Sequence, residues 1–317
     1  MSMSSESTAL IALGGNALIL AGEKGYIEEQ FNHADACMKH LAGLISQGMR
    51  VVITHGNGPI VGNILLRNEC AKDYIPPMPL YICVADSQGG IGAMMAQSLR
   101  NQLKKLGIAT TVLAMITHAL VDKADPAFQD PSKPIGPYYS DAAARSHRES
   151  DGWVMRKVRA KGWRRLVPSP IPHKIIEREA IRSALDNGMI AIASGGGGIP
   201  VIEENGILKG VDAVIDKDHS ASLLARELGL KRLIILTDVD GVYLNWNNKK
   251  RKRIERLSLD DARRYLREGQ FPPGDMGPKI EAAIAFIASG GEETIIAQPE
   301  EVAKALSGRA GTRISAS

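Results

Sequence analysis

Short apolar runs that end in glycine recur along the chain, and each is followed by a stretch with helical periodicity. Val, Ile, Leu and Ala dominate these runs, as in strands buried on both faces of a parallel sheet. Strands that alternate with helices indicate repeated βαβ units and an α/β fold with a mainly parallel sheet. We expect strands at residues 10–13, 51–53, 110–116, 190–193, 233–236 and 294–297, and a helix at about 300–306.

The segment from about residue 118 to 172 interrupts this rhythm because it is rich in proline and in charge. We interpret it as an excursion from the main sheet, such as a lid or a protruding subdomain. The basic run at residues 249–253 is the densest charge block. We expect it in a solvated hairpin between two strands, with phosphate attraction as the minor alternative.

Composition narrows the class of protein. The chain has 317 residues, 44% of them hydrophobic and 23% charged, which favours one large unit or two closely packed lobes. A net charge of +4 gives no reason to expect a nucleic-acid partner. The cysteines Cys37, Cys70 and Cys83 are widely spaced, and no apolar run approaches the roughly 20 residues of a membrane-spanning helix. We therefore expect a cytoplasmic protein with no membrane partner.

Three of the expected strands end in glycine loops, at residues 14–16, 56–59 and 195–198. Backbone N–H groups freed by glycine beside helix N-termini bind anions without any side chain. Several such loops together predict a polyphosphate ligand, whereas a single loop is equally explained by a tight turn. The chain has neither G-x-x-x-x-G-K-[ST] nor G-x-G-x-x-G, so a P-loop enzyme and a Rossmann dehydrogenase are disfavoured.

Three lysines lie among residues that fix the backbone or add negative charge. Lys217 and Lys279 each stand at the start of a helical pattern, and Lys123 stands in the excursion between two aspartates. Phosphoryl transfer needs positive charge held on the moving group, and such lysines supply it. The alternative is that each is an ordinary surface lysine.

Other catalytic signatures are missing. The histidines His55, His118 and His219 show no metal-ligand spacing, and H-E-x-x-H does not occur. Ser194 is not part of a G-x-S-x-G motif, which disfavours serine hydrolase chemistry. We expect no metal site built from side chains.

These motifs resemble those of the carbamate kinases, a branch of the amino-acid kinase family, from about residue 10 to 312. The matching stretches, in order and spacing, are ALGGNA at 12–17, THGNGP at 54–59, LVDKADPAF at 120–128, KPIGP at 133–137, VPSP at 167–170, GGGGIP at 195–200, AVIDKD at 213–218, LTDVD at 236–240 and MGPK at 276–279. Ile60, Ala93 and His118 depart from the usual pattern, outside the set of lysines.

The resemblance implies a three-layer αβα sandwich with an open eight-stranded sheet, a homodimer and a place in arginine metabolism. It divides a single domain into a carbamate-binding half (about 1–205), a lid (about 118–172) and a nucleotide-binding half (about 206–317). ATP or ADP, Mg²⁺, carbamate and carbamoyl phosphate are the expected ligands. The implied catalytic residues are Lys123, Lys217, Asp218 and Lys279; the substrate loops are Gly14, Gly15, Asn16, Gly56, Asn57 and Gly58; the nucleotide site is Thr237, Asp238, Tyr243, Met276 and Gly277.

The expected chemistry is reversible phosphoryl transfer between ATP and carbamate. A carbamate oxygen is already anionic, so attack on phosphorus needs no general base, and Asp218 is expected to orient Lys217 and Lys279. Two alternatives stay open: a kinase of the same fold that acts on a different carboxylate, and a non-catalytic sensor of nucleotide or carbamoyl phosphate. Retention of all three lysines and Asp218 favours an active enzyme.

Overall fold

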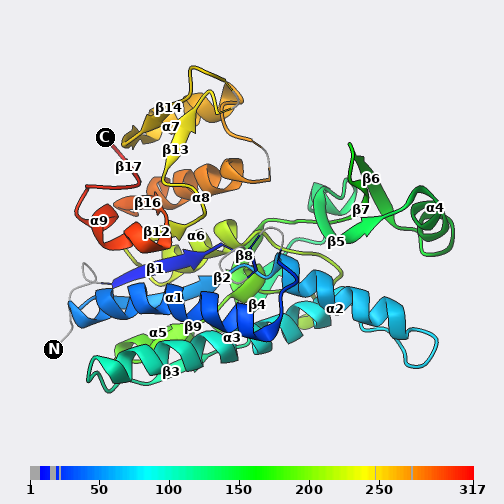
Figure 1. Ribbon diagram of the computed structural model, residues 1–317, viewed down its shortest axis with the longest axis horizontal. Coiled ribbons are helices and arrows are strands. Elements are labelled where there is room, and N and C mark those ends of the chain that lie inside the picture. The colour runs from blue at the N-terminus through cyan, green and yellow to red at the C-terminus, as the bar shows by residue number, and fades with distance from the viewer. Residues whose placement is uncertain (1–7, 15–18, 21–22, 247, 273) are drawn as a thin grey trace.

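The structure is a computed structural model that describes residues 8–14, 19–20, 23–246, 248–272 and 274–317. Its centre is an eight-stranded sheet in which the six strands from β16 to β3 are parallel (Figure 1). Strand β17 runs antiparallel to β16, and β15 pairs parallel with β17. The prediction of an open, mainly parallel sheet is confirmed. In spatial order the strands are β15 (Arg256–Ser258), β17 (Thr312–Ser315), β16 (Glu293–Ala297), β12 (Arg232–Leu236), β1 (Thr8–Leu13), β2 (Arg50–His55), β9 (Ile190–Ile192) and β3 (Val112–Ala114).

Helices cover both faces of this sheet, which gives the expected three layers. Alternate residues of β1 point to opposite faces, so Leu10 packs into one core and Ile11 into the other. The Leu10 face is covered by α5 (Arg178–Asp186), α6 (Lys217–Glu227), α7 (Leu259–Arg267) and α8 (Met276–Ala288). The Ile11 face is covered by α1 (Ile27–Ser46), α3 (Leu80–Lys105) and α9 (Val302–Leu306), which follows the short helix η5 (Pro299–Glu301).

Two smaller sheets extend the core. A four-stranded sheet has the order β11 (Ile207–Gly210), β10 (Ile199–Glu204), β4 (His118–Val121) and β8 (Pro172–Ile175). A hairpin joins β13 (Val242–Leu244) to β14 (Lys252–Ile254), and Lys249 and Lys250 are exposed at its turn. The solvated hairpin predicted for the basic run is therefore present.

The excursion forms a protruding subdomain, to which we refer below by the predicted name, the lid. It leaves the four-stranded sheet at β4 and returns at β8, which pairs antiparallel with β4. Between them lie η3 (Pro126–Phe128), β5 (Lys133–Tyr139), α4 (Asp141–Ser150), β6 (Val154–Val158) and β7 (Gly162–Val167). Strands β5, β7 and β6 form their own sheet, which projects above α2 (Gly58–Ala71) at the right of Figure 1. Within the described part of the chain, no helix has both the length and the hydrophobicity to cross a membrane.

Candidate active site

The carboxyl ends of three adjacent strands are tied together by backbone hydrogen bonds. Gly14 N–H donates to the carbonyl of Leu236 at 3.0 Å, and Gly56 N–H donates to the carbonyl of Leu13 at 2.9 Å. Asn57 then caps α2, and its buried amide donates to Ser87 Oγ at 2.8 Å. Gly14 and the loop that begins at Gly56 therefore lie side by side at the carboxyl ends of the strands, where ligands of open α/β sheets bind.

The third glycine loop, which contains the short helix η4 (Gly195–Gly197), packs beneath them. A Cβ atom on Gly196 would lie 2.2 Å from Asn57 Nδ2, and one on Gly197 would lie 2.6 Å from the carbonyl oxygen of Ile215. Gly197 also has a φ of +93°, which other residues rarely adopt. Glycine is required here because the loop must touch both the Asn57 loop and the segment that leads into α6.

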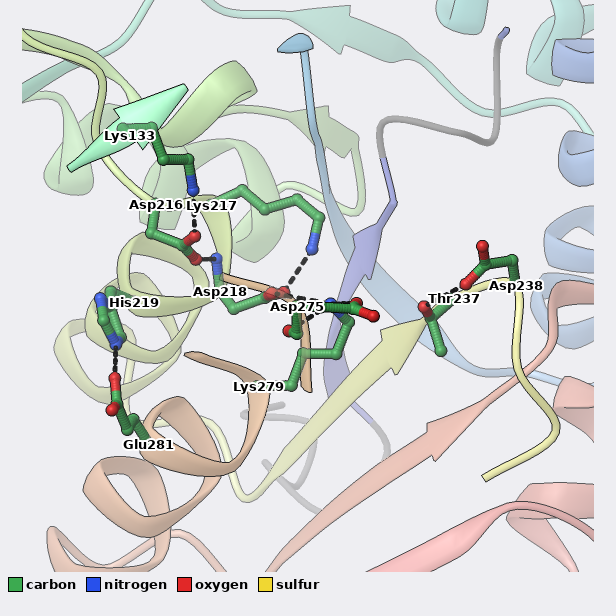
Figure 2. Close-up of polar contacts among 10 residues, drawn as sticks. All are labelled: Lys133, Asp216, Lys217, Asp218, His219, Thr237, Asp238, Asp275, Lys279 and Glu281. Atoms are coloured by element: carbon green, nitrogen blue, oxygen red, sulfur yellow. Dashed lines mark hydrogen bonds and ion pairs between the residues drawn. The ribbon is translucent and has the colours of Figure 1, made fainter. Parts of the chain in front are cut away.

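A cluster of lysines and carboxylates lies where α6 and α8 begin. Lys217 donates a hydrogen bond to Asp218, and Lys279 Nζ lies 3.6 Å from the other oxygen of the same carboxylate. Figure 2 shows Asp218 between the two ammonium groups. The Asp218 side chain is only 3% exposed, so the two lysines provide the positive charge that a buried carboxylate requires. The structure thus brings together three of the four residues that we predict to be catalytic.

The fourth predicted residue, Lys123, lies elsewhere. Its side chain is 73% exposed, and its Nζ pairs with Glu204 Oε1 at 2.6 Å at the base of the lid. The lysine of the lid that does reach the cluster is Lys133, the first residue of β5, which pairs with Asp216 Oδ2 at 2.5 Å. The catalytic role expected of Lys123 stays a prediction, and sequence reasoning missed Lys133. A signal was available, because Lys133 opens the KPIGP stretch, in which two prolines and a glycine constrain the backbone.

The charges of this cluster hold one another ionised. Burial alone would raise the pKa of Asp216, but the positive charges of Lys133 and Lys217 outweigh it, and the pKa lies well below its ordinary value. Burial would likewise lower the pKa of Lys279, yet the negative charges of Asp218 and Asp275 raise it. Three ammonium groups, on Lys133, Lys217 and Lys279, therefore meet two buried carboxylates.

Two cavities open on either side of the lysine pair, because Lys217 and Lys279 line both. The smaller, of about 210 Å³, lies between the lid and the helix starts and is also lined by Asn57, Lys133 and Asp218. Residues from the first turns of α2, α6 and α8 line it, and the N–H groups and dipoles of helix N-termini favour an anion. A lysine in the first turn of a helix opposes that dipole, so an anion bound in this cavity would offset the unfavourable interaction at Lys217.

The larger cavity, of about 400 Å³, extends from the lysine pair toward α1 and η5. Thr237 and Asp238, two of the predicted nucleotide residues, line it together with Gly14, which we predict to bind substrate. Thr237 Oγ1 donates to Asp238 at 3.1 Å. Tyr243, Met276 and Gly277 line neither cavity. Tyr243 instead donates to Asp240 at 2.9 Å, and Met276 packs into the core. The predicted substrate residues Gly15 and Asn16 lie outside the described residues.

Histidines near the site have structural partners. His55 is buried and accordingly its pKa falls to about 4, which leaves the ring neutral at pH 7. His219 Nε2 lies 3.1 Å from Glu281 on the far side of α6, as Figure 2 shows. Among the described residues, no three His, Cys, Asp or Glu side chains gather in a way that could hold a metal ion.

Comparisons with known proteins agree with this geometry. The sequence profile of the amino acid kinase family matches residues 7–298. The carbamate kinase of Pyrococcus horikoshii is 47% identical over 308 residues, which cover 96% of this chain and 98% of that protein. The carbamate kinase of Trichomonas vaginalis is 40% identical with the same coverage.

A solved structure gives the same result. The carbamate kinase of Giardia lamblia bound to AMP-PNP superposes with a TM-score of 0.93 at 39% identity and covers 99% of both chains. The match extends over the sheet, the lid and the cluster-bearing helices, since almost no part of either chain is left out. The chain therefore belongs to the amino acid kinase family and, within it, to the carbamate kinases.

Proposed function

We propose that this protein catalyses reversible phosphoryl transfer between ATP and carbamate, giving ADP and carbamoyl phosphate. The observation that supports this most directly is the position of Lys217 and Lys279, which are held by one carboxylate and shared by two cavities. A phosphoryl group that passes between ligands in the two cavities would remain beside both ammonium groups throughout. Such charge neutralisation is the main requirement of phosphoryl transfer.

The acceptor would occupy the smaller cavity. Gly56, Asn57 and Gly58 line it at the start of α2, and Lys133 lines it from the lid. Carbamate is small, planar and anionic, and its oxygen attacks phosphorus without losing a proton. The carboxylates present suit this chemistry because Asp216 and Asp218 are both committed to lysines, so neither acts as a base.

The nucleotide would occupy the larger cavity, beside Thr237 and Asp238, with its terminal phosphates at the lysine pair. The assignment divides the domain into an acceptor half, about residues 1–205, and a nucleotide half, about residues 206–317. We also assign the lid, about residues 118–172, the task of bringing Lys133 to the acceptor. Lys133 is then the lid lysine that neutralises charge, in the role that the sequence had given to Lys123.

Magnesium would be bound mainly through the nucleotide. The two buried carboxylates nearest the phosphates are engaged by lysines, and Mg²⁺ typically keeps several waters and takes its remaining ligands from substrate phosphates. When bound, the ion neutralises charge on the bridging phosphate oxygens. The residues of this chain then supply alignment: Lys217 and Lys279 bind the phosphoryl group, and Asp218 positions both.

We further propose a homodimer that acts in the cytoplasm on metabolites of the arginine pathways. The three cysteines are free, in keeping with a reducing compartment. Light scattering after size exclusion should give twice the chain mass of 34.1 kDa. A mass near 34.1 kDa at micromolar concentration would contradict the dimer.

The proposed reaction is tested by ATP formation from ADP, Mg²⁺ and an acyl phosphate. Carbamoyl phosphate should support turnover, whereas acetyl phosphate and acetylglutamyl phosphate should support much less, because the small cavity fits a compact acceptor. Equal turnover with another acyl phosphate would identify a kinase of different specificity. Binding of ADP and carbamoyl phosphate without any turnover would identify a sensor.

A further inference from the structure

A further cavity of about 260 Å³ lies between α2 and the lid, and it shares only Ile135 with the smaller cavity of the candidate active site. Its wall is formed by Glu69 of α2 and by Tyr139, His147, Asp151, Trp153 and Arg165 of the lid. We call it the lid–helix pocket. None of these polar and aromatic wall residues lines the two cavities of the candidate active site. The phosphoryl-transfer chemistry proposed above therefore leaves the pocket without a role.

The acidic groups of this pocket already have partners. His147 lies between Glu69 Oε1, at 3.0 Å, and Asp151 Oδ2, at 2.6 Å. Tyr139 donates its hydroxyl to Glu69 Oε2 at 2.8 Å. These contacts tie the lid to α2, and they occupy the carboxylates with internal hydrogen bonds. They also keep the imidazole ring parallel to Trp153, with ring centroids 4.0 Å apart.

Arg165 is different, because its guanidinium lines the pocket without a polar partner. No hydrogen bond or ion pair joins its side chain to any of the described residues; its one defined contact is with the face of Trp153, 4.3 Å from the ring centroid. Asp212 and Asp151 influence it only through space, and burial lowers its pKa. Partial burial removes some of the hydration of a guanidinium, and an anionic ligand can replace it by accepting hydrogen bonds from the unpaired N–H donors.

We propose that the lid–helix pocket binds a small oxyanion, a carboxylate or a phosphate, on the guanidinium of Arg165. A planar guanidinium binds either group through two parallel hydrogen bonds, and the Trp153 ring behind it fixes its orientation. Lys72, which is exposed and also lines the pocket, adds positive charge at the rim. The aromatic wall provides apolar contact for the remainder of an organic anion.

The position of this pocket gives its ligand a route to the active site. Helix α2 runs from Gly58, beside the acceptor cavity, to the turn that carries Glu69, and β5 runs from Lys133 to Tyr139. A ligand that joins Arg165 of the lid to α2 would fix the distance between these two rigid elements. It would thereby act on the placement of Lys133 relative to Asn57.

Trp153 provides a direct readout of binding, since it stacks against Arg165. The other two tryptophans, Trp163 and Trp246, are replaced by Phe, and retained turnover confirms that this variant folds. Inorganic phosphate, malonate and ethylammonium chloride are titrated separately at constant ionic strength. Saturable change in Trp153 fluorescence with phosphate or malonate is expected, and the stronger of the two identifies the class of anion.

Three variants locate the site. Arg165→Gln should raise the Kd obtained from the fluorescence titration at least about tenfold, because a charge-assisted bidentate contact is lost. Arg165→Lys should recover part of the affinity. The matched control is Arg156→Gln, an exposed arginine on the neighbouring strand β6 that does not line the pocket; it should leave the response unchanged. Lys217→Ala should also leave it unchanged, because Lys217 does not line the pocket. This variant disrupts the anion site of the active centre and so tests whether the response comes from there.

The proposal fails if neither anion gives a saturable response, or if ethylammonium alone gives one, which would make this a cation site. It also fails if Arg165→Gln binds as well as the parent. Loss of the response in Lys217→Ala would place the anion at the phosphoryl-transfer site. None of these results depends on which acyl phosphate the enzyme uses, so they test the pocket independently of the proposed function.

Discussion

The Asp218 carboxylate lies 3.6 Å from the Nζ atom of Lys279, although the two residues belong to the first turns of different helices. Asp218 also accepts from Lys217, its neighbour in sequence. One buried carboxylate thus fixes the separation of two ammonium groups that both face ligand cavities. Because each of its oxygens faces an ammonium group, we infer that Asp218 positions the two lysines and does not act as a base.

Asp218→Asn should lower kcat on the order of 100-fold, because misplacement of reacting groups by about 1 Å has that effect. The amide keeps the size of the side chain but loses the charge that holds both lysines. KM for ADP and for carbamoyl phosphate should change much less. Steady-state kinetics in the direction of ATP formation measure both constants.

The pH–rate profile separates this positioning role from general-base catalysis. A base would give the wild type an acid limb in the direction of carbamate phosphorylation, and Asp218→Asn would remove that limb. A positioning residue lowers the rate at every pH and leaves the shape of the profile unchanged. An abolished acid limb, or a rate within about twofold of the wild type, would falsify the positioning role.

We predict different effects on kcat when Lys133 and Lys123, two lysines of the lid, are replaced by alanine. Lys133→Ala should lower kcat for carbamoyl phosphate about 100-fold or more, as expected when one donor to the transferred group is removed, and should leave ADP affinity nearly unchanged. Lys123→Ala should alter either constant less than about twofold, because its exposed ion pair with Glu204 contributes little. Assays of the two variants, with ADP binding by calorimetry, decide between them. A larger loss for Lys123→Ala would restore the role that the sequence assigned to it.

Sequence reasoning identified those cluster residues that lie close to a helix start. Lys217, Asp218 and Lys279 each lie in the first turn of a helix that follows constrained backbone, and such a pattern is local. The ion pair of Lys133 with Asp216 spans 83 residues, and no local pattern states which way a lid folds back. Sequence reasoning therefore named Lys123 and not Lys133, and the catalytic role expected of Lys123 stays a prediction.

The fold, like the site, has features that local sequence pattern predicts and features that depend on contacts between distant segments. Buried β-branched runs predict the strands and their parallel pairing, because only strands covered on both faces are apolar throughout. Their order in space depends on contacts between distant segments, such as Leu10 opposite Leu233. The short strand β17, which lies between the edge strand β15 and β16, runs antiparallel to β16, and nothing in its sequence distinguishes that direction. Tertiary packing, rather than local pattern, sets both features.

The glycine loop offers a test of packing at the site. Gly197→Ala should destabilise the protein by about 1–3 kcal/mol through backbone strain and by about 1–3 kcal/mol more through the clash with Ile215. Gly188→Ala is the matched control, since Gly188 has a φ of +72° but nothing within 4 Å of the added Cβ. Urea denaturation of both variants measures the difference. Equal destabilisation would mean that the loop relaxes and that contact with Ile215 is not required.

The last prediction concerns the pair of His219 and Glu281, which joins α6 to α8 beneath the lysine cluster. Burial would lower the pKa of His219, but the hydrogen bond with Glu281 and the charge of Asp216 outweigh it, so the pKa rises above 6.5. The same hydrogen bond lowers the pKa of Glu281 below 4.5. The stabilisation is therefore complete between about pH 4.5 and 6.5. It is lost as the pH rises through the folded pKa of His219, and also as the pH falls through that of Glu281.

Glu281→Gln should accordingly lower the free energy of unfolding most at about pH 5.5, by about 0.2–1 kcal/mol because Glu281 is partly exposed. The difference from the wild type should shrink above pH 6.5, as His219 loses its proton. Urea denaturation from pH 4 to pH 8.5 measures this dependence. The control is Glu149→Gln, because Glu149 is exposed and forms no ion pair with the described residues. A difference for Glu281→Gln that is constant with pH, or that grows above pH 7, would show that the pair acts as a neutral hydrogen bond and that His219 is not charged in the folded protein.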